Sequence, residues 1–435
     1  MSVITDFDIA TDLKVEFLLP EESENLFIVG ISKLGGTDLL NSGGAFVIGE
    51  SLLGGTDLLG ASAISWQNLS CEVSQAQLSI GGSVKDQLYF QPEPAQANLT
   101  LQGYTFDPNN NASFRPGVGV RVKLEKDDYS EIIWRGVIDT INATYDAEGN
   151  NLMRLTAIDD MKRLFNTRLA TFDSENEDNY VTPYEQLELI AEEFGTHMNS
   201  ASIETPGKIP STLLSDVIPN NLVYEAIQVG LGLFWLDPET QEFVLVPRPD
   251  SSILPDFPVG AGYFTLGESL LGGEDVLGSG DPVYTIGNDH DQFYHLCMTD
   301  LDTTSSDDEV FNSLKVELES DPATYELIEN ADSIQLYGKF ATDVTLNTTD
   351  ATELSRWANA VFTQSPTALV RQVGTKTKDL QGNLTEAALF LPGGLVGVDY
   401  TKGSFEVKDY YTITKVVHSI DVNNWFTTID TWKEG

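Results

Sequence analysis

The chain has 435 residues, of which 67 are Asp or Glu and 24 are Lys or Arg, so its formal net charge is -43. This excess of carboxylates disfavours nucleic acid as a tightly held ligand, because phosphate binding depends on Lys and Arg. It is compatible with a wall along which DNA passes without sticking, and equally with adaptation of a whole proteome to salt water.

Length and residue usage also limit the fold. The length predicts roughly two to four domains, and 36 glycines with only 21% charged residues favour a turn-rich β protein. Cys71 and Cys297 are the only cysteines, so we expect neither a disulfide framework nor a Cys-based zinc site. The first eight residues lack the basic and apolar regions of a signal peptide. No run is long enough to span a membrane, so we expect a soluble product made in the cytoplasm.

The N-terminal region contains an internal repeat. Residues 27–40 are matched by residues 46–59, and a third copy lies at residues 264–277. Each copy reads as a short apolar strand, a Gly-Gly bend and an Asp-Leu-Leu or Asp-Val-Leu continuation. No copy has the Lys-Ser/Thr of a P-loop, so a structural turn is favoured over a phosphate site. We expect these Leu-Gly-Gly segments to be β-extensions that pack on a neighbouring subunit.

Residues 87–165 read as a small β-barrel closed by a helix. Apolar and polar residues alternate, as in strands with one buried face, at residues 95–101, 118–124, 132–139, 141–145 and 152–157. The turn at residues 146–150 has the Gly and Asn of a tight hairpin. Residues 159–165 predict a short helix with acids first and bases last, which suits the helix dipole.

A mixed helical region follows the barrel. The acidic run at residues 173–179 lacks the Gly and distal Glu of a calcium loop, so a solvated linker is favoured. Thr182, Pro183 and Glu185 predict a capping box that opens a helix ending at Gly195. A second helix is expected near residues 222–229, before a hairpin of residues 233–236 and 242–246.

The C-terminal third predicts one helix and a closing hairpin. Leu354, Trp357, Ala358, Val361 and Phe362 follow the spacing of an amphipathic helix. Asp350 and Glu353 cap that helix and Ser365-Pro366 ends it. The last two strands are expected at residues 411–420 and 425–432, around an Asp-Val-Asn-Asn turn.

No catalytic constellation stands out in the sequence. The histidines are His197, His290, His295 and His418, and none lies in a metal-binding pattern. His290-Asp291 with His295 is the nearest approach to a ligand cluster, and polar surface is the favoured interpretation. There is no nucleophile motif, whereas carboxylate pairs for glycoside hydrolysis stay open because chance pairs are common among 67 acids. We predict no catalytic residue, no cofactor and no metal.

The order of these pieces resembles the tail hub proteins of tailed bacteriophages, a group related to the baseplate hub of contractile tails. The resemblance covers about a quarter of the chain and is carried by Leu-Thr-Leu at 99–101, Phe-Asp-Pro at 106–108, Arg-Pro-Gly at 115–117, Trp-Arg-Gly-Val-Ile-Asp at 134–139 and Leu-Thr-Ala-Ile-Asp-Asp at 155–160. His418 on one strand and Trp425-x-Thr427 on the next resemble the closing hairpin of the second barrel in that family.

The resemblance implies a mainly β chain of the α+β class. It implies two tail-tube-like antiparallel β-barrels, an inserted mixed helix and hairpin domain, and β-extensions. The predicted domains are an N-terminal extension, a first barrel, a helical and hairpin domain, a repeat-containing insert and a second barrel, at residues 1–64, 65–168, 169–250, 251–283 and 284–435.

The resemblance also implies a function without chemistry. The expected protein is a homotrimeric tail hub at the virion tail tip, which joins the six-fold tube or distal tail ring to the three-fold tip. Expected neighbours are distal tail or tube proteins, the tape measure protein and tail fibre or spike proteins. Genomic DNA would pass through without specific binding, and the duplication predicts acidic strand residues of both barrels along the channel. Alternatives are a carbohydrate-active enzyme or host-binding adhesin of the tip, and a distal tail ring protein with one barrel per chain.

Overall fold

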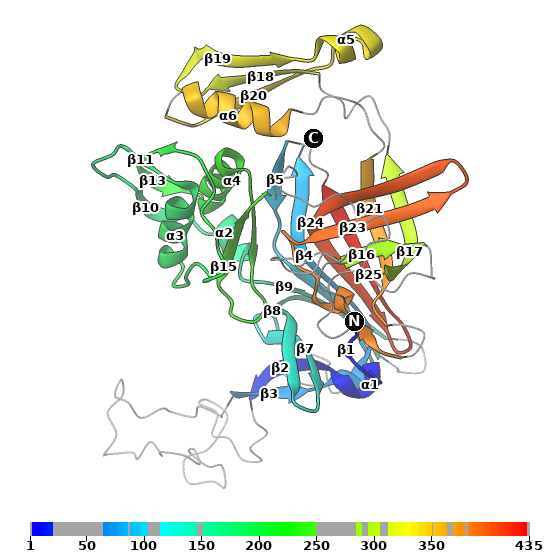
Figure 1. The fold of residues 1–435 in the computed structure, drawn as a ribbon. Helices are drawn as coiled ribbons and strands as arrows, with labels where there is room; N and C mark the ends of the chain where they lie inside the picture. The colour runs from blue at the N-terminus through cyan, green and yellow to red at the C-terminus, as the bar shows by residue number, and fades with distance from the viewer. Residues whose placement is uncertain are drawn as a thin grey trace, which may run out of the picture.

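The computed structural model describes residues 2–20, 64–85, 88–102, 114–145, 151–248, 284–288, 295–304, 312–349, 351–362, 369–378 and 382–432. The described chain is mostly β with a few helices, and one 14-stranded sheet takes strands from both ends of the sequence (Figure 1). This confirms the predicted mainly β, α+β fold class. The three Leu-Gly-Gly repeats, the loop at residues 106–111, the turn at residues 146–150, the cap residue Asp350, the stop Ser365-Pro366 and His290 lie outside the described residues.

Six strands from the C-terminal part of the chain form a closed barrel. In the order in which they pair, these are β23 (Leu395–Lys402), β16 (Tyr284–Gly287), β17 (His295–Thr304), β21 (Leu369–Lys376), β25 (Trp425–Trp432) and β24 (Phe405–Asp421). Pairing between β23 and β24 completes the circle, and β16 is parallel to both of its neighbours. Val373, Val396 and Ile429 are fully buried inside. The barrel therefore has its own apolar core.

The N-terminal strands continue the same sheet without closing on themselves in the described residues. Their order is β4 (Val73–Lys85), β6 (Gln96–Gln102), β9 (Asn151–Ile158), β8 (Tyr129–Tyr145), β7 (Gly119–Lys126), β2 (Leu13–Pro20) and β3 (Ile64–Asn68), and β5 (Tyr89–Pro92) also pairs with β4. The sequence predicted a closed barrel here. One edge of β4 is instead occupied by β24 of the other unit, so the sheet stays open. Strand β2 comes from the range 1–64 that was assigned to an extension, and the domain limits as a whole stay predictions.

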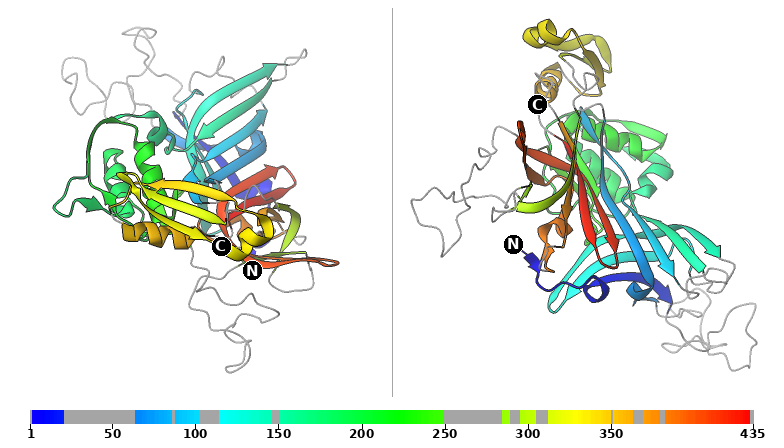
Figure 2. Two further views of the ribbon diagram at one scale, coloured as in Figure 1. Left: turned by 90° about the horizontal axis from the view of Figure 1, so that it is seen from above. Right: turned by 90° about the vertical axis from the view of Figure 1, so that its right-hand side faces the viewer.

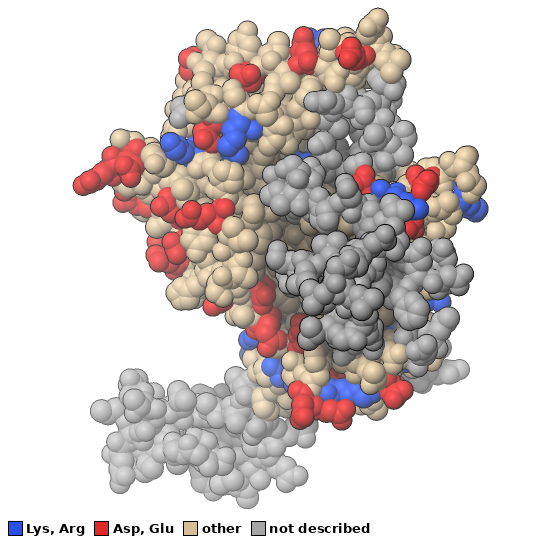
Figure 3. Space-filling model, in the orientation of Figure 1, with Lys and Arg blue, Asp and Glu red and all other residues tan. Residues whose placement is uncertain are grey.

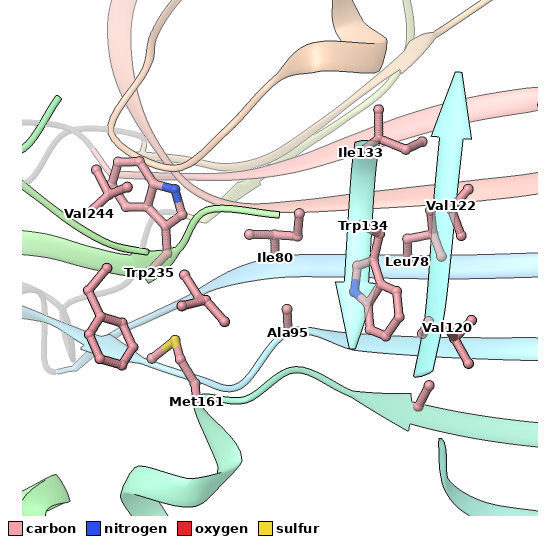
Figure 4. Close-up of a cluster of buried hydrophobic side chains, with 14 of the residues drawn as sticks. Leu78, Ile80, Ala95, Val120, Val122, Ile133, Trp134, Met161, Trp235 and Val244 are labelled. Carbon is pink, nitrogen blue, oxygen red and sulfur yellow. The ribbon is translucent and has the colours of Figure 1, made fainter. Parts of the chain in front are cut away.

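The core of the open sheet extends into the neighbouring helical region. Phe17, Leu99 and Trp134 are buried to within 1% exposure in the same cluster as residues of the helices. Figure 4 shows Trp134 beside Leu78 and Val122, and Trp235 of the later hairpin lying toward Ile80 and Met161. The helical region is thus attached to the sheet by a continuous apolar contact.

The helical region contains the predicted helices and the predicted hairpin, together with four short strands that the sequence did not predict. The helices and the hairpin are α2 (Lys162–Asn166), α3 (Pro183–Glu193), α4 (Pro219–Gly230), β14 (Gly232–Leu236) and β15 (Phe243–Pro247). The four further strands are β10 (Leu169–Asp173), β11 (Tyr180–Val181), β12 (Ile209–Pro210) and β13 (Leu213–Val217). The capping box is present, since Thr182 Oγ1 accepts from the Glu185 N–H and the Glu185 carboxylate accepts from the Thr182 N–H at 2.7 Å. Helix α2 begins three residues later than the predicted range, and the buried Asp159 precedes it.

A compact unit interrupts the closed barrel between β17 and β21. It consists of β18 (Ser313–Leu318), β19 (Asp321–Glu329), α5 (Ala331–Tyr337), β20 (Ala341–Leu346) and α6 (Ala351–Val361). Helix α6 buries the predicted apolar residues against the sheet, with Trp357 fully buried. Trp357 Nε1 donates to Gln228 O at 2.6 Å and Arg356 donates to Val229 O at 2.8 Å. These bonds satisfy carbonyls at the end of α4 and fix the unit to the helical region.

The N-terminal segment links the two β units. Strand β1 (Ser2–Ile4) pairs with β22 (Leu384–Thr385), and the Phe7 N–H donates to Gly382 O at 2.8 Å. The short helix α1 (Ile9–Asp12) then leads directly into β2. The first residues of the chain therefore touch the C-terminal unit before they join the N-terminal sheet.

Candidate functional site

The two β units are joined edge to edge by β4 and β24. The antiparallel register runs from Gly81 opposite Lys415 to Gln75 opposite Asp421. Figure 2 shows the strands of the two halves side by side in its right-hand view. Gly81 has a φ of +116°, and a Cβ there would lie 2.2 Å from Thr414 O. Only glycine fits this junction without a shift of the β24 backbone.

Eight consecutive strands across this junction form one antiparallel surface. Their order is β17, β21, β25, β24, β4, β6, β9 and β8, and every neighbouring pair is antiparallel. One side of these strands carries the apolar cores of both units. The other side faces solvent, and we call it the outer face. Because side chains alternate along a strand, the register determines which residues lie on it.

The N-terminal half of the outer face carries amides and hydroxyls and no carboxylate among its described strand residues. Its members on β4, β6, β9 and β8 include Gln75, Gln77, Ser79, Gln96, Asn98, Thr100, Gln102, Thr156, Thr140, Asn142 and Thr144, together with the cation Arg154. Asn98 Oδ1 accepts from Thr156 Oγ1 at 3.1 Å and from Gln96 Nε2 at 3.2 Å. The pattern is visible in the sequence as polar residues that alternate with Ala76, Leu78 and Ile80.

The C-terminal half of the outer face carries charges of both signs. They are Asp300, Asp302, Asp421 and Asp430 with Lys376 and Lys415. Lys415 is paired with Glu93 at 2.7 Å, and Gln372 donates to Asp430 at 2.9 Å. The described outer face is thus acidic on its C-terminal half only, and the residues named on it carry a far smaller net charge than the whole chain. The expectation that acidic strand residues of both units lie along a channel stays a prediction.

The acidic residues gather elsewhere on the surface. Figure 3 shows Asp and Glu side chains concentrated over the helical region, at the left of the view. The run at residues 173–179 belongs to this region and is mostly exposed. Its internal bonds are local, for example from the Glu175 N–H to Asp173 Oδ1 at 3.0 Å. The excess of negative charge is therefore separated from the N-terminal half of the outer face.

A buried polar network lies just beneath the outer face in the closing hairpin. His418 on β24 is opposite Thr427 on β25, and His418 Nδ1 lies 2.9 Å from Thr427 Oγ1. Trp425 Nε1 donates to the same Nδ1 at 3.3 Å, and Thr377 Oγ1 is 2.6 Å from Thr427 Oγ1. Since an indole N–H only donates, Nδ1 is the acceptor and the ring is neutral. Burial lowers the pKa of His418 to about 4. The His and Trp-x-Thr motif is thus a structural anchor of the hairpin.

Asp159 is the buried titratable group of the N-terminal unit. Its side chain is 3% exposed, and Oδ1 has no hydrogen-bond partner among the described residues. Burial raises the pKa of this carboxyl well above its usual range, although the backbone N–H groups of Ala95 and Met161 act in the opposite direction. This buried carboxyl lies at the junction of β9 and α2, where the sequence predicted acidic residues at the start of a helix.

The remaining described histidines and the two cysteines lie in different parts of the fold. His197 is exposed after α3, and His295 lies in β17. Cys71 is exposed and Cys297 is partly buried. Across the part of the chain that the structure describes, no three His, Cys, Asp or Glu side chains are grouped as a metal site would require. None of the described helices combines the length and apolar character needed to cross a membrane.

Two solved structures share this arrangement over most of the chain. A tail protein from Neisseria meningitidis superposes with a TM-score of 0.54 over 86% of this chain and 94% of its own, at 10% identity. The 43 kDa tail protein of a Shewanella oneidensis prophage gives 0.51 over 85% and 95%, at 12% identity. No protein-family model matches the chain, and no curated protein matches it significantly. The predicted resemblance is therefore confirmed at the level of the fold: this chain has the fold of phage tail proteins.

Proposed function

We propose that this chain is a structural protein of a phage tail and that three copies form the tail hub. In that assembly the ring joins the six-fold tail tube or distal tail ring to the three-fold tip and surrounds the DNA exit channel. Its neighbours would be the distal tail or tube proteins, the tape measure protein and the tail fibre or spike proteins. The chain itself would carry out no reaction.

The observation that supports this proposal most directly is the shared sheet. One chain contains two β units joined through β4 and β24, so three chains would supply six units around one axis. A distal tail ring with one unit per chain would need six copies instead. The fold likeness to two tail proteins agrees with a tail role.

The chemistry of the outer face suits a channel through which DNA passes. Amides and hydroxyls bind phosphates less strongly than Lys and Arg, because they release no counterions. They also repel DNA less than the carboxylates that dominate the rest of the surface. A nearly neutral wall therefore allows passage without retention.

Light scattering on the purified chain tests the assembly. A trimer of three 47.7 kDa chains that persists on dilution, with a three-fold ring in averaged electron micrographs, is the expected result. A hexamer would favour the distal tail ring, and a monomer would contradict the ring. Antibody labelling of virions tests the position, and label along the tube or on the head would contradict a hub.

A further inference from the structure

The open sheet carries cations in facing pairs at its lower end, where β2, β3 and β7 lie together (Figure 1). Lys14 on β2 is directly opposite Lys123 on β7, and Arg121 on β7 is directly opposite Arg135 on β8. All four side chains lie on the solvent side of their strands, because the residues that alternate with them are buried. We call these four residues the cationic patch.

The cationic patch is unfavourable for the folded chain taken alone. Like charges directly opposite each other in an antiparallel ladder destabilise it. Two carboxylates moderate the repulsion, since Glu16 is ion-paired with Arg121 and Glu125 with Lys123. Four cations therefore share two ion-paired carboxylates among the described residues. The patch keeps an excess of positive charge on a chain whose net charge is -43, and bound anions would relieve the repulsion.

An indole forms the floor beside the two arginines. Trp66 on β3 lies opposite Leu18 on β2, and a Cβ at Gly119 on β7 would lie 3.2 Å from the indole. The ring therefore reaches across β2 as far as β7, where glycine leaves room for it. The guanidinium carbon of Arg121 is 4.4 Å from the centroid of this ring, and that of Arg135 is 5.7 Å from it. Cation–π contacts thus hold both guanidinium groups beside one indole.

Two guanidinium groups held in this way are suited to carboxylates. The planar fork of an arginine binds a carboxylate through two parallel hydrogen bonds. Arg121 uses Nε for its bond to Glu16, which leaves its terminal nitrogens for a second acceptor. Its side chain is 20% exposed, and Arg135 is also partly exposed. An anion from solvent can therefore reach both arginines.

The charge of the whole chain limits the kind of anion. A long polyanion such as DNA would be repelled by the carboxylates that dominate the rest of the surface. Figure 3 shows Lys and Arg atoms at the lower end of the molecule, away from the acidic helical region. A patch that covers two facing pairs of residues matches a few consecutive side chains and not an extended strand of phosphates. A short acidic stretch of a protein satisfies both conditions.

We propose that the cationic patch binds a short acidic segment of another protein. Arg121 and Arg135 would donate to carboxylates of that segment, and Trp66 would form the floor of the site. All of these residues belong to one chain, so the site does not depend on the proposed trimer. A monomeric chain that binds acidic peptide would contradict the hub and leave this inference standing.

A labelled hexaglutamate peptide tests the site by fluorescence anisotropy. At physiological salt, distant charges are screened beyond about 8 Å, so the local patch dominates. We expect the parent to bind this peptide and not hexaglutamine. Arg135→Gln should weaken binding roughly tenfold, and Arg135→Lys, which keeps the charge but loses the planar fork, should weaken it less. The matched control is Arg168→Gln, an exposed arginine paired with Asp216 in the helical region, which should bind like the parent.

The remaining outcomes would overturn the proposal. Equal losses in Arg135→Gln and Arg168→Gln would mean that binding follows net charge and not the patch. Tighter binding of a six-nucleotide oligothymidylate through Arg135 would make the ligand a nucleic acid. Glu21, Glu22 and Glu24 follow β2 in the sequence, so all three are also changed to Gln. Tighter peptide binding in that variant would assign the site to the chain's own acids, and no binding in either background would exclude a carboxylate site.

Discussion

The two β units of this chain complete their sheets in different ways. The C-terminal unit closes on itself, because β23 pairs with both β16 and β24. The N-terminal unit stays open in the described residues, and its strand β4 pairs with β24 of the other unit. The two units are therefore not independent barrels. The C-terminal barrel closes with its own strands, whereas β4 of the N-terminal sheet pairs with β24 of that barrel.

The buried titratable groups extend this comparison. His418 in the closed unit is neutral because burial lowers its pKa to about 4, whereas burial raises the pKa of Asp159 in the open unit and so disfavours its charged form. The unfolded chain would protonate His418 below about pH 6.5 and ionise Asp159 above about pH 4. Acid therefore destabilises the closed unit through His418, while rising pH destabilises the open unit through Asp159.

The largest expected effect comes from emptying either core. Trp134 is fully buried in the core of the open sheet and Ile429 is fully buried in the core of the closed barrel, and Trp134→Ala and Ile429→Ala should each cost about 2 to 5 kcal/mol of unfolding free energy. If the shared sheet unfolds as one body, both variants shift a single urea transition. Two separate transitions would show that the units are independent. Trp66→Ala, at the partly exposed edge strand, should cost clearly less.

The next effect is the pH dependence of His418. Above about pH 6.5 the histidine is neutral in both the folded and the unfolded chain, so the free energy of unfolding is at its full value. As the pH falls toward about 4, the unfolded chain is protonated at His418 while the folded chain is not, and the free energy of unfolding decreases. The loss should reach roughly 3 kcal/mol across this interval. In His418→Gln the corresponding slope of unfolding free energy against pH should disappear, whereas His197→Gln, an exposed site, should retain it. An unchanged slope in His418→Gln would show that another group titrates.

Gly81→Ala should weaken the junction between the units. The added Cβ would clash with Thr414 O in the β24 backbone, and the residue would also have to adopt a positive φ that side chains disfavour. We therefore expect the free energy of unfolding to fall by about 1 to 3 kcal/mol. Gly117→Ala is the matched control, because its φ is +90° but no atom lies within 4 Å of its Cβ. Equal losses in thermal unfolding would mean that strain, and not the junction, sets the effect.

The smallest effect is expected for Asp159→Asn. The amide replaces a carboxyl whose charged form is disfavoured by burial, so the unfolding free energy at pH 7 should rise relative to the parent and the gain should shrink toward pH 4. Asp160→Asn changes the adjacent exposed acid, which is paired with Arg163, and should change stability by less than about 0.5 kcal/mol. A uniform change across pH for Asp159→Asn would contradict a buried neutral acid.

Local signals in the sequence predicted local structure well. The capping box at Thr182, the hairpin of β14 and β15 and the apolar face of α6 each depend on residues a few positions apart, so the pattern alone identifies them. The pairing of Gly81 with Lys415 has no such signal, because strand edges are chosen by the folded context. The three-stranded sheet beside α6 was missed for the same reason, because its parallel pair β18 and β20 depends on a crossover.

The outer face was predicted only in part. The alternation of polar and apolar residues in β4 and β6 predicted strands with one buried side. Its meaning depended on which strands share a face, and this required the register across β24, β4 and β6. The resemblance to tail hub proteins came from the order of the motifs, which predicted the fold but not the position of the charges.

The pairing of β1 with β22 has a consequence for biosynthesis. Residues 2–4 leave the ribosome long before residues 384–385 exist, yet these two segments bond to each other, and Phe7 packs on Trp425 with ring centroids 5.9 Å apart. Such distant partners make folding slow, since a long loop must close before the contact forms. The pairing of β1 with β22 therefore cannot form until residues 384–385 have been translated. It is a late step in folding, which follows the synthesis of nearly the whole described sequence.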